Sequence, residues 1–236
     1  MAYGTESIPR VNKIFGPGNR FVTLAKQLVS MEGVAIDLPA GPSEVLVVAD
    51  EQVPARFIAA DLLSQAEHGS DSQVLLLSTS KELLENTRQE IDKMLKDLPR
   101  KDIAEKALEH SRLILLSDMT EIMEMVNFYA PEHLILATEN ATELSRKVRN
   151  SGSVFIGNYT PESLGDYTSG TNHVLPTNGY AMSHSGVNLD AFVKKITFQM
   201  ASRESLGNIG ESTMIMARAE GLEAHSKAVQ VRLENK

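Results

Sequence analysis

The stretch Val45-Leu46-Val47-Val48-Ala49 is a short, almost unbroken apolar run in which β-branched residues predominate. A strand buried on both faces of a parallel sheet has this composition, whereas a half-exposed strand alternates apolar and polar residues. Two similar runs, Val74–Leu77 and Leu134–Ala137, each come after a segment with helical periodicity, Ala55–Ala66 and Glu121–Tyr129 respectively. Strands that alternate with amphipathic helices predict an α/β fold with a mainly parallel sheet flanked by helices.

The same alternation extends over most of the chain. Further strands are predicted at Val11–Phe15, Leu113–Leu116 and Val154–Ile156, and further helices at Phe21–Met31, Lys81–Leu98, Ile103–His110 and Thr142–Asn150. Ligands of parallel α/β sheets usually bind outside the carboxyl ends of the strands, and we expect the functional site there.

The amino-acid composition and the periodicity of the sequence change beyond Gly157. Residues 158–188 are rich in Gly, Ser, Thr, Asn, Pro and Tyr and lack regular periodicity, which predicts a long ordered loop packed over a site. Residues 189–201 are ambiguous between strands and helix. Residues 205–230 have the pattern of one or two helices that end in a polar tail.

Composition excludes several classes of protein. The chain has 236 residues, a formal net charge of −8 and no cysteine. An acidic chain without a basic patch is a poor match for nucleic acid or an acidic membrane, so we expect neither as a partner. Without thiolates, a bound metal must be held by nitrogen and oxygen ligands. The absence of a signal-peptide pattern and of a bilayer-length apolar run is typical of a cytoplasmic protein.

The first candidate site is Asp61-Leu62-Leu63-Ser64-Gln65-Ala66-Glu67-His68-Gly69, where a helical pattern ends. If the helix continues to this point, Gln65 and His68 are at i and i+3 and share one face. Gly69 is a natural helix stop, which would place an amide oxygen and an imidazole at the edge of a cleft. The alternative is that both side chains are solvated or capping groups at a helix end.

Three other places contain groups able to do chemistry. Glu132-His133 precedes a predicted strand and suits general acid–base catalysis, with a surface Glu and a capping His as an equally weighted alternative. Asp166, in the long loop, is either a hard oxygen ligand or an Asx-turn carboxylate. Glu220 and His225 are five residues apart, about 140° around a helix, so solvated charge is the default interpretation.

Glycine-rich turns form a further candidate. Gly16-Pro17-Gly18-Asn19 separates a predicted strand from a predicted helix. Such a turn can present backbone N–H groups to a phosphate, with Asn19 as the cap or the ligand contact. It is also an ordinary tight turn and lacks the full dinucleotide fingerprint.

Taken together, these motifs resemble one enzyme family. The segments that carry the resemblance are Gly16-Pro17-Gly18-Asn19, Pro39-Ala40-Gly41-Pro42-Ser43-Glu44, Asp61–Gly69, Ala130-Pro131-Glu132-His133-Leu134, Gly165-Asp166-Tyr167, Gly170–Thr177 and Glu220–His225. In this order they are similar to histidinol dehydrogenase, and the resemblance runs from about residue 2 to the C-terminus.

The resemblance implies a zinc-containing, NAD-dependent enzyme of histidine biosynthesis that oxidises L-histidinol to L-histidine through the aldehyde. Glu132 and His133 match the acid–base pair. One zinc ion per subunit is expected on Gln65, His68, Asp166 and, from the second subunit of a homodimer, His225. Ser43, His133 and Glu220, together with the metal ligands, match substrate contacts, and Asn19 matches an NAD contact.

The resemblance also implies a domain organisation. Family members have a comparably long stretch ahead of the region seen here, so we expect a fragment with an incomplete Rossmann-like sheet. Residues 1–42 are predicted to be a remnant of a second nucleotide-binding-like lobe, 43–187 the main α/β domain with the metal and substrate site, and 188–236 a helical dimerisation segment. The alternative functions are a catalytically impaired zinc-binding or dimerisation fragment and a metal hydrolase that uses Glu132 to activate water.

Overall fold

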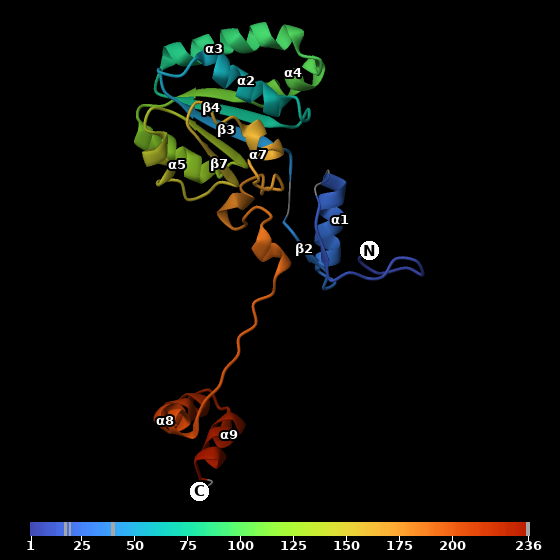
Figure 1. Ribbon diagram of the computed structural model, residues 1–236, viewed down its shortest axis with the longest axis vertical. Helices are drawn as coiled ribbons and strands as arrows, with labels where there is room; N and C mark the ends of the chain where they lie inside the picture. The colour runs from blue at the N-terminus through green and yellow to red at the C-terminus, as the bar shows by residue number, and fades with distance from the viewer. Residues whose placement is uncertain (17, 19, 39–40, 235–236) are drawn as a thin grey trace. The chain divides into compact units, whose positions relative to one another are not determined.

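The computed structural model describes residues 1–16, 18, 20–38 and 41–234. The chain divides into two compact units, Met1–Phe192 and Val193–Lys236. The first unit contains a parallel sheet in the strand order β5-β4-β3-β6-β7 (Figure 1). Its strands are β3 (Glu44–Ala49), β4 (Gln73–Ser78), β5 (Arg112–Leu115), β6 (His133–Ala137) and β7 (Ser153–Ile156). The predicted α/β fold with a parallel sheet flanked by helices is therefore confirmed.

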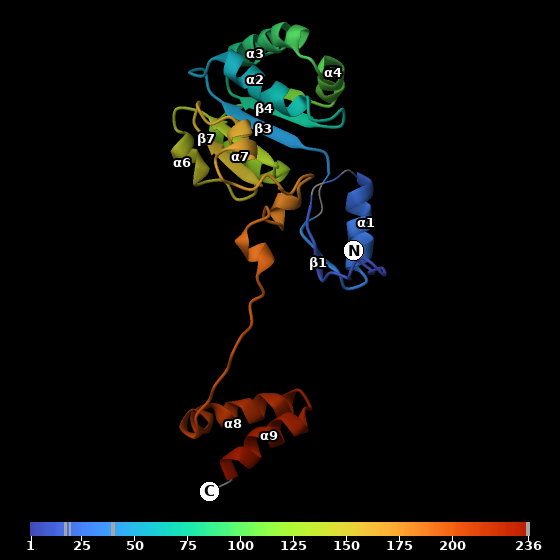
Figure 2. The same cartoon turned by 45° about the vertical axis from the view of Figure 1, so that its right-hand side comes forward.

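The apolar run that begins at Val45 lies at the centre of this sheet because it is buried on both faces. Val45 and Val47 belong to a core that also contains residues of α2 (Ala55–Ala66), α3 (Lys81–Met94) and α4 (Lys101–Glu109). Leu46 and Val48 belong to the opposite core, with residues of α5 (Met119–Tyr129) and α6 (Ala141–Ser145). The two groups of helices cover opposite faces of the sheet (Figure 2). Successive side chains of a strand point to opposite faces, so an unbroken apolar run requires two cores.

Two predicted helices are shorter than their sequence pattern indicates. The helix expected over residues 81–98 ends at Met94 and continues as the 3₁₀ turn η1 (Leu95–Asp97). The helix expected over residues 142–150 ends at Ser145. Beyond it, the backbone N–H groups of Arg149 and Asn150 donate to the side-chain oxygen of Asn127, at 2.6 and 3.3 Å. A side chain of α5 thus supplies the partners that a continued helix would have supplied.

Asn127 is expected to be a sensitive position for stability. Its side-chain nitrogen also donates to the carbonyl groups of Met123 and Lys147, and the residue is only 7% exposed. Asn127→Ala leaves one buried and several partly buried backbone groups without their partner and should lower the free energy of unfolding by about 2–3 kcal/mol. Urea denaturation measures the change. Asn188→Ala, which removes an exposed side-chain acceptor for Asp190 N–H, is the matched control and should cost much less. Equal losses in the two variants would contradict the prediction.

The segment predicted as a long ordered loop contains regular structure. Residues 158–188 include the helix α7 (Glu162–Tyr167) and the 3₁₀ turn η2 (Tyr180–Met182), and the 3₁₀ turn η3 (Leu189–Phe192) follows directly. The prediction was wrong at α7 because the helix is short and has a glycine, Gly165, inside it. That glycine has a packing role: a Cβ there would lie 2.7 Å from the ring of Phe155 in β7.

The N-terminal part of the first unit forms a small substructure of its own. A parallel pair, β1 (Lys13–Ile14) and β2 (Ala35–Ile36), flanks α1 (Arg20–Ser30). The side chain of Asp37 is fully buried and pairs with Lys26 of α1. Asp37 also accepts the N–H of Gly16 at 2.8 Å, and Lys26 donates to the Gly16 carbonyl at 2.9 Å. A buried ion pair therefore holds the beginning of the glycine-containing turn.

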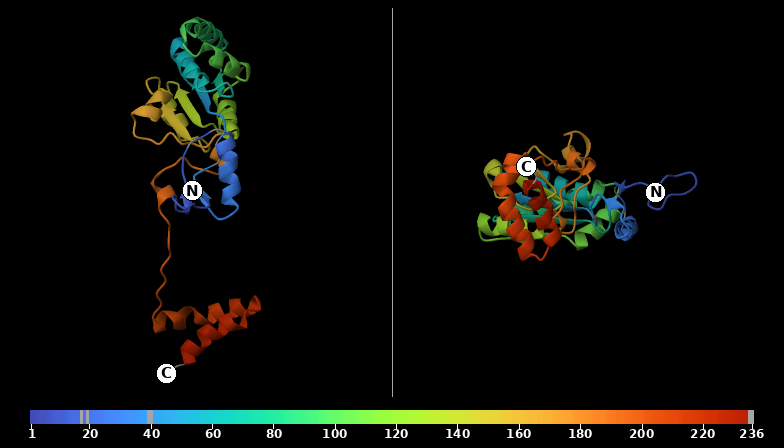
Figure 3. Two further views of the ribbon diagram at one scale, coloured as in Figure 1. Left: turned by 90° about the vertical axis from the view of Figure 1, so that its right-hand side faces the viewer. Right: turned by 90° about the horizontal axis from the view of Figure 1, so that it is seen from below.

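The second unit contains a helical hairpin of α8 (Arg203–Ala219) and α9 (Glu223–Glu234) (Figure 3). Ser202 and Ser205 form a reciprocal cap at the start of α8, and Gly221 has a positive φ of 74° in the connection. Within the ambiguous segment 189–201, only η3 is helical, and residues 193–202 form neither strand nor helix. No helix in the described ranges is long and apolar enough to cross a lipid bilayer.

Candidate active site

The candidate site lies at the amino ends of the parallel strands. Ser43 immediately precedes β3, His133 is the first residue of β6, and His68 lies between α2 and β4. The prediction that the site lies outside the carboxyl ends was therefore wrong for these residues. The location has an electrostatic consequence, because α2 and α5 end where β4 and β6 begin. Helix C-termini carry a partial negative charge, which favours a bound cation rather than a phosphate.

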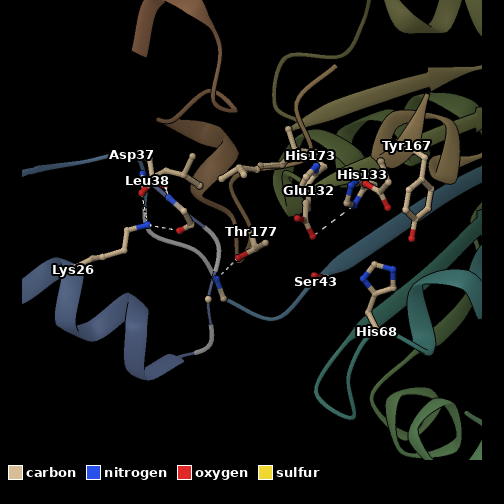
Figure 4. Close-up of a pocket in the computed structure, with 16 residues that line it drawn as sticks. Lys26, Asp37, Leu38, Ser43, His68, Glu132, His133, Tyr167, His173 and Thr177 are labelled. Atoms are coloured by element: carbon tan, nitrogen blue, oxygen red, sulfur yellow. Dashed lines mark hydrogen bonds and ion pairs between the residues drawn. The ribbon is translucent and has the colours of Figure 1, made fainter. Parts of the chain in front are cut away.

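A cavity of about 310 Å³ opens at this edge of the sheet (Figure 4). Its size suits a small polar ligand. The polar side chains that line it are Lys26, Asp37, Ser43, His68, Glu132, His133, Asp166, Tyr167, His173 and Thr177. In Figure 4, His68 approaches from one segment and the adjacent residues Glu132 and His133 from another, while the pair of Lys26 and Asp37 lies on the other side of the cavity. The cavity thus brings together Ser43, His68, Asp166 and the acid–base candidates.

The main chain of Glu44 orients both Glu132 and His133. Its N–H donates to Glu132 Oε2 at 2.9 Å, and its carbonyl oxygen is 3.0 Å from His133 Nδ1. A carbonyl can only accept, so Nδ1 carries the proton and Nε2 keeps its lone pair. His133 Nε2 is buried and has no hydrogen-bond partner among the described residues. The geometry therefore leaves His133 Nε2 as a nitrogen able to accept a proton. Glu132 and His133 are adjacent in sequence, and the main chain of Glu44 holds both.

Burial shifts the pKa values of these two groups in opposite directions. Burial lowers the pKa of His133 below its ordinary value, which keeps the imidazole neutral at neutral pH. Burial, with the nearby charges of Glu44 and Asp166, raises the pKa of Glu132 to about 8, against the lowering effect of the Glu44 N–H. A neutral imidazole beside a carboxyl that titrates near neutrality is a pair suited to exchanging protons.

A second group of residues can hold a metal ion. One ligand atom each of His68, Glu162 and Asp166 lies within 4.8 Å of the others. Glu162 was missed by the sequence analysis, although it is 2% exposed and lies four residues before Asp166 in α7. The i, i+4 spacing of two carboxylates would have identified it if this segment had been predicted as a helix.

Gln65 and His68 do not share the helix face that the sequence predicts for them. Helix α2 ends at Ala66, so His68 lies beyond the helix and the shared helix face is absent. Gln65 is fully buried, whereas His68 is exposed. With its amide oriented to satisfy both partners, the Gln65 nitrogen donates to both carboxylate oxygens of Glu162, at 3.1 Å for Oε2. Gln65 thus joins the metal-binding group through Glu162 and does not line the cavity.

The charges of this region fit a cation. Burial, together with Asp166, Glu132 and Asp61, raises the pKa of Glu162 to about 9. Burial raises the pKa of Asp61 to about 7. Among the described residues, several carboxyl groups surround one imidazole here without a positively charged partner to balance them. A bound metal ion would supply that positive charge. The donor set of imidazole nitrogen with carboxylate and amide oxygens is compatible with zinc.

The remaining predicted site residues belong to the second unit or lie outside the described residues. Glu220 and His225 are exposed and belong to the second unit, at the end of α8 and in α9. Asn19 lies outside the described residues, although Gly16 and Gly18 line the cavity. His173 also lines the cavity; it belongs to the Gly170–Thr177 motif, and the sequence predicts no separate role for it.

Gly152 is expected to tolerate no side chain next to Glu132. A Cβ at this position would lie 2.6 Å from the Glu132 carbonyl oxygen and 3.1 Å from Leu175 Cβ. Because backbone must move, Gly152→Ala should lower the free energy of unfolding by about 1–3 kcal/mol. Denaturant titration tests this. Gly207→Ala is the control, because nothing lies within 4 Å of its added Cβ in α8, and it should be neutral or stabilising by up to about 1 kcal/mol. A neutral Gly152→Ala would contradict this close packing against Glu132 and Leu175.

Comparisons with known proteins agree on one family. The family model for histidinol dehydrogenase matches residues 1–233. The histidinol dehydrogenase of Bacteroides thetaiotaomicron is 59% identical over 233 residues, which are 99% of this chain and 54% of that protein. The relative from Pseudoalteromonas translucida is 56% identical, with 99% and 54% covered.

A solved structure gives the same result. The crystal structure of histidinol dehydrogenase from Elizabethkingia anophelis matches with a TM-score of 0.97 and 56% identity, over 99% of this chain and 54% of that one. The chain therefore spans about half the length of the relatives it matches. With the matching family model, the conclusion is that this chain belongs to the histidinol dehydrogenase family.

Proposed function

We propose that this chain takes part in the NAD-dependent oxidation of L-histidinol to L-histidine through the aldehyde. The observation that carries the proposal is the geometry of Glu132 and His133, both held by the main chain of Glu44. His133 Nδ1 lies 3.5 Å from Glu132 Oε2 and contacts the Glu44 carbonyl, which leaves the buried Nε2 without a hydrogen-bond partner among the described residues. An alcohol releases hydride readily only as its O–H proton leaves, so each oxidation needs a base of this kind.

The acid–base pair divides the proton transfers. His133 Nε2 takes the hydroxyl proton of histidinol as hydride leaves its carbon for NAD⁺. Glu132 takes a proton from the water that adds to the aldehyde, and the resulting hydrate gives up the second hydride. The Glu44 N–H stabilises the carboxylate form of Glu132 that this step requires.

We assign zinc to His68, Asp166 and Gln65, with His225 supplied by a second copy of the chain. When bound, zinc orients the imidazole and amine of the substrate and neutralises the surrounding carboxylates. The donor set and the excess of buried acid support this assignment. Ser43 in the cavity wall and Glu220 of the second copy complete the proposed substrate contacts.

The nicotinamide cofactor accepts the hydride, because no protein side chain can do so. We propose that the turn at residues 16–19, with Asn19, contributes to its binding. Support comes from the position of Gly16 and Gly18 in the wall of the same cavity. The helix-terminus charges at this edge suit the metal rather than a phosphate, so the turn, and not α2 or α5, is the part expected to face the cofactor.

A homodimer is the proposed assembly. Apolar side chains of the second unit are strongly exposed, among them Ile196 (67%), Phe198 (91%) and Met200 (100%). Exposed apolar groups at this density are typical of surfaces that contact another protein. A second copy of the chain covers them in our proposal and also supplies Glu220 and His225.

The test is NADH formation from histidinol by the purified chain, with and without a chelator. We expect turnover that the chelator abolishes and added zinc restores, and a large loss for His225→Asn. Stoichiometric zinc uptake without histidinol-dependent NADH absorbance would instead support a metal-binding module without the oxidation. Turnover that no chelator affects would contradict the assignment of zinc.

A further inference from the structure

Glu162 and Gln65 form a contact that the proposed reaction does not use directly. Both side chains are buried, with 2% and 0% exposure, and they come from different elements, α7 and α2. With the Gln65 amide oriented so that its nitrogen faces the carboxyl group, that nitrogen lies 3.1 Å from Glu162 Oε2 and also contacts Oε1. Glu162 Oε1 is 3.9 Å from His133 Nδ1. One carboxyl group therefore touches a proposed metal ligand and lies beside the proposed base.

The contact decides which end of the Gln65 amide is available. An amide has a donor end and an acceptor end, and only the oxygen binds a metal cation. When its nitrogen donates to the two oxygens of Glu162, the Gln65 oxygen faces away from that carboxyl group. When Glu162 is ionised, a half-turn of the amide would instead place the Gln65 oxygen against the carboxylate oxygens, two acceptors facing each other in a buried place, which is costly.

The geometry points to Glu162 as a positioning residue, which holds the Gln65 amide so that its oxygen, not its nitrogen, is presented to the metal. This inference rests on the proposed zinc site. Groups that orient a ligand in this way typically change metal affinity by about 10–100-fold when they are removed. Glu162 itself need not contact the metal, although its oxygens lie as close to His68 and Asp166 as a ligand would.

The first experiment measures zinc affinity by competition with a chromophoric chelator. Glu162→Leu, which keeps a buried side chain without an acceptor, should bind zinc about 10–100-fold more weakly. Glu162→Gln keeps an acceptor oxygen and should recover part of that loss. Thermal unfolding in the presence of chelator verifies that each variant is folded. Unchanged affinity in a folded Glu162→Leu would overturn the inference.

Asp61→Asn is the matched control for charge. Asp61 is another largely buried acid close enough to raise the pKa of Glu162. Its replacement removes a nearby negative charge and leaves the amide contact intact, so zinc affinity should change much less than in Glu162→Leu. Equal losses in the two variants would assign the effect to charge and overturn the positioning role.

A double-mutant cycle separates positioning from direct ligation. If Glu162 acts through Gln65, Glu162→Leu should cost no further affinity once Gln65→Ala is present. Additive losses would make Glu162 a ligand in its own right and contradict the inference.

A metal-free measurement separates this inference from the proposed function. The side-chain amide protons of Gln65, followed by ¹⁵N NMR, should exchange slowly with solvent in the parent chain and faster in Glu162→Leu. If that difference is seen while the parent chain binds no zinc, the amide contact stands and the proposed metal site fails. If exchange is the same in both proteins, the inference fails.

Discussion

Asp37→Asn is expected to lower the free energy of unfolding by about 3 kcal/mol. The substitution leaves the Lys26 ammonium, whose residue is 9% exposed, without the carboxylate that compensates its charge. It also weakens the acceptors for the N–H groups of Gly16 and Leu38, both 2.8 Å from Asp37 oxygens. Removing one partner of a buried ion pair is costly because the other charge stays buried.

Glu90→Gln is the matched control for this prediction. Glu90 pairs with Lys93 on the surface of α3, where the lysine side chain is 64% exposed. Surface pairs of this kind contribute roughly 0–1 kcal/mol, so the control should be nearly neutral. Chemical denaturation of both variants measures the difference. A cost for Asp37→Asn no larger than for Glu90→Gln would show that the Lys26 pair is unimportant for stability.

The same ion pair gives the parent chain a pH dependence. Burial alone would raise the pKa of Asp37, but hydrogen bonds from Lys26, Gly16 and Leu38 lower it below its ordinary value. The stabilisation is therefore fully present above the unfolded-state pKa of about 3.9 and is lost as the pH falls through the lower, folded-state pKa. Asp37→Asn should lack this component of the acid transition.

His133→Asn is expected to lower histidinol-dependent NADH formation by about 10²–10⁴-fold. Asparagine can still donate to the Glu44 carbonyl but provides no basic nitrogen in place of Nε2. Zinc affinity should change little, because the assigned ligands are other residues. Rates and zinc affinity are measured on the same preparations of the chain.

His110→Asn is the control, because His110 is exposed at the end of α4. It should leave the rate unchanged. If His133→Asn retains the parent rate, His133 is not the base and the proposed mechanism fails. If zinc affinity falls together with the rate, His133 has a metal-related role that the present assignment omits.

The elements predicted best from the sequence are those whose burial is unambiguous. The run beginning at Val45 and the run beginning at Leu134 became central strands because apolar side chains on both faces permit no half-exposed position. The end of α6 was not predictable in this way. It depends on Asn127, a residue of another helix, and no local pattern records that contact.

The sequence predicted which residues form the candidate site better than it predicted where in the fold the site lies. A general rule for parallel sheets placed it at the carboxyl ends, whereas Ser43, His68 and His133 lie at the amino ends. The rule describes ligands, often anionic, that bind at helix N-termini. A cation does not bind there, because helix N-termini carry a partial positive charge. Glu162 was missed because a glycine within a short helix hides its periodicity.

The role of Glu44 has a consequence for how this family can vary. Two functional side chains are oriented by the main-chain N–H and carbonyl of one residue, so no amino-acid replacement at that position removes these contacts, apart from proline, which has no N–H. A substitution of Glu44 should therefore act through its own buried side chain, which accepts the Asn178 N–H at 2.8 Å, and not through the orientation of Glu132 and His133. An insertion or deletion between Gly41 and Glu44 would shift the strand by a residue and remove both contacts at once. The orientation of Glu132 and His133 therefore depends on the length of the chain before β3 and not on which side chain stands at position 44.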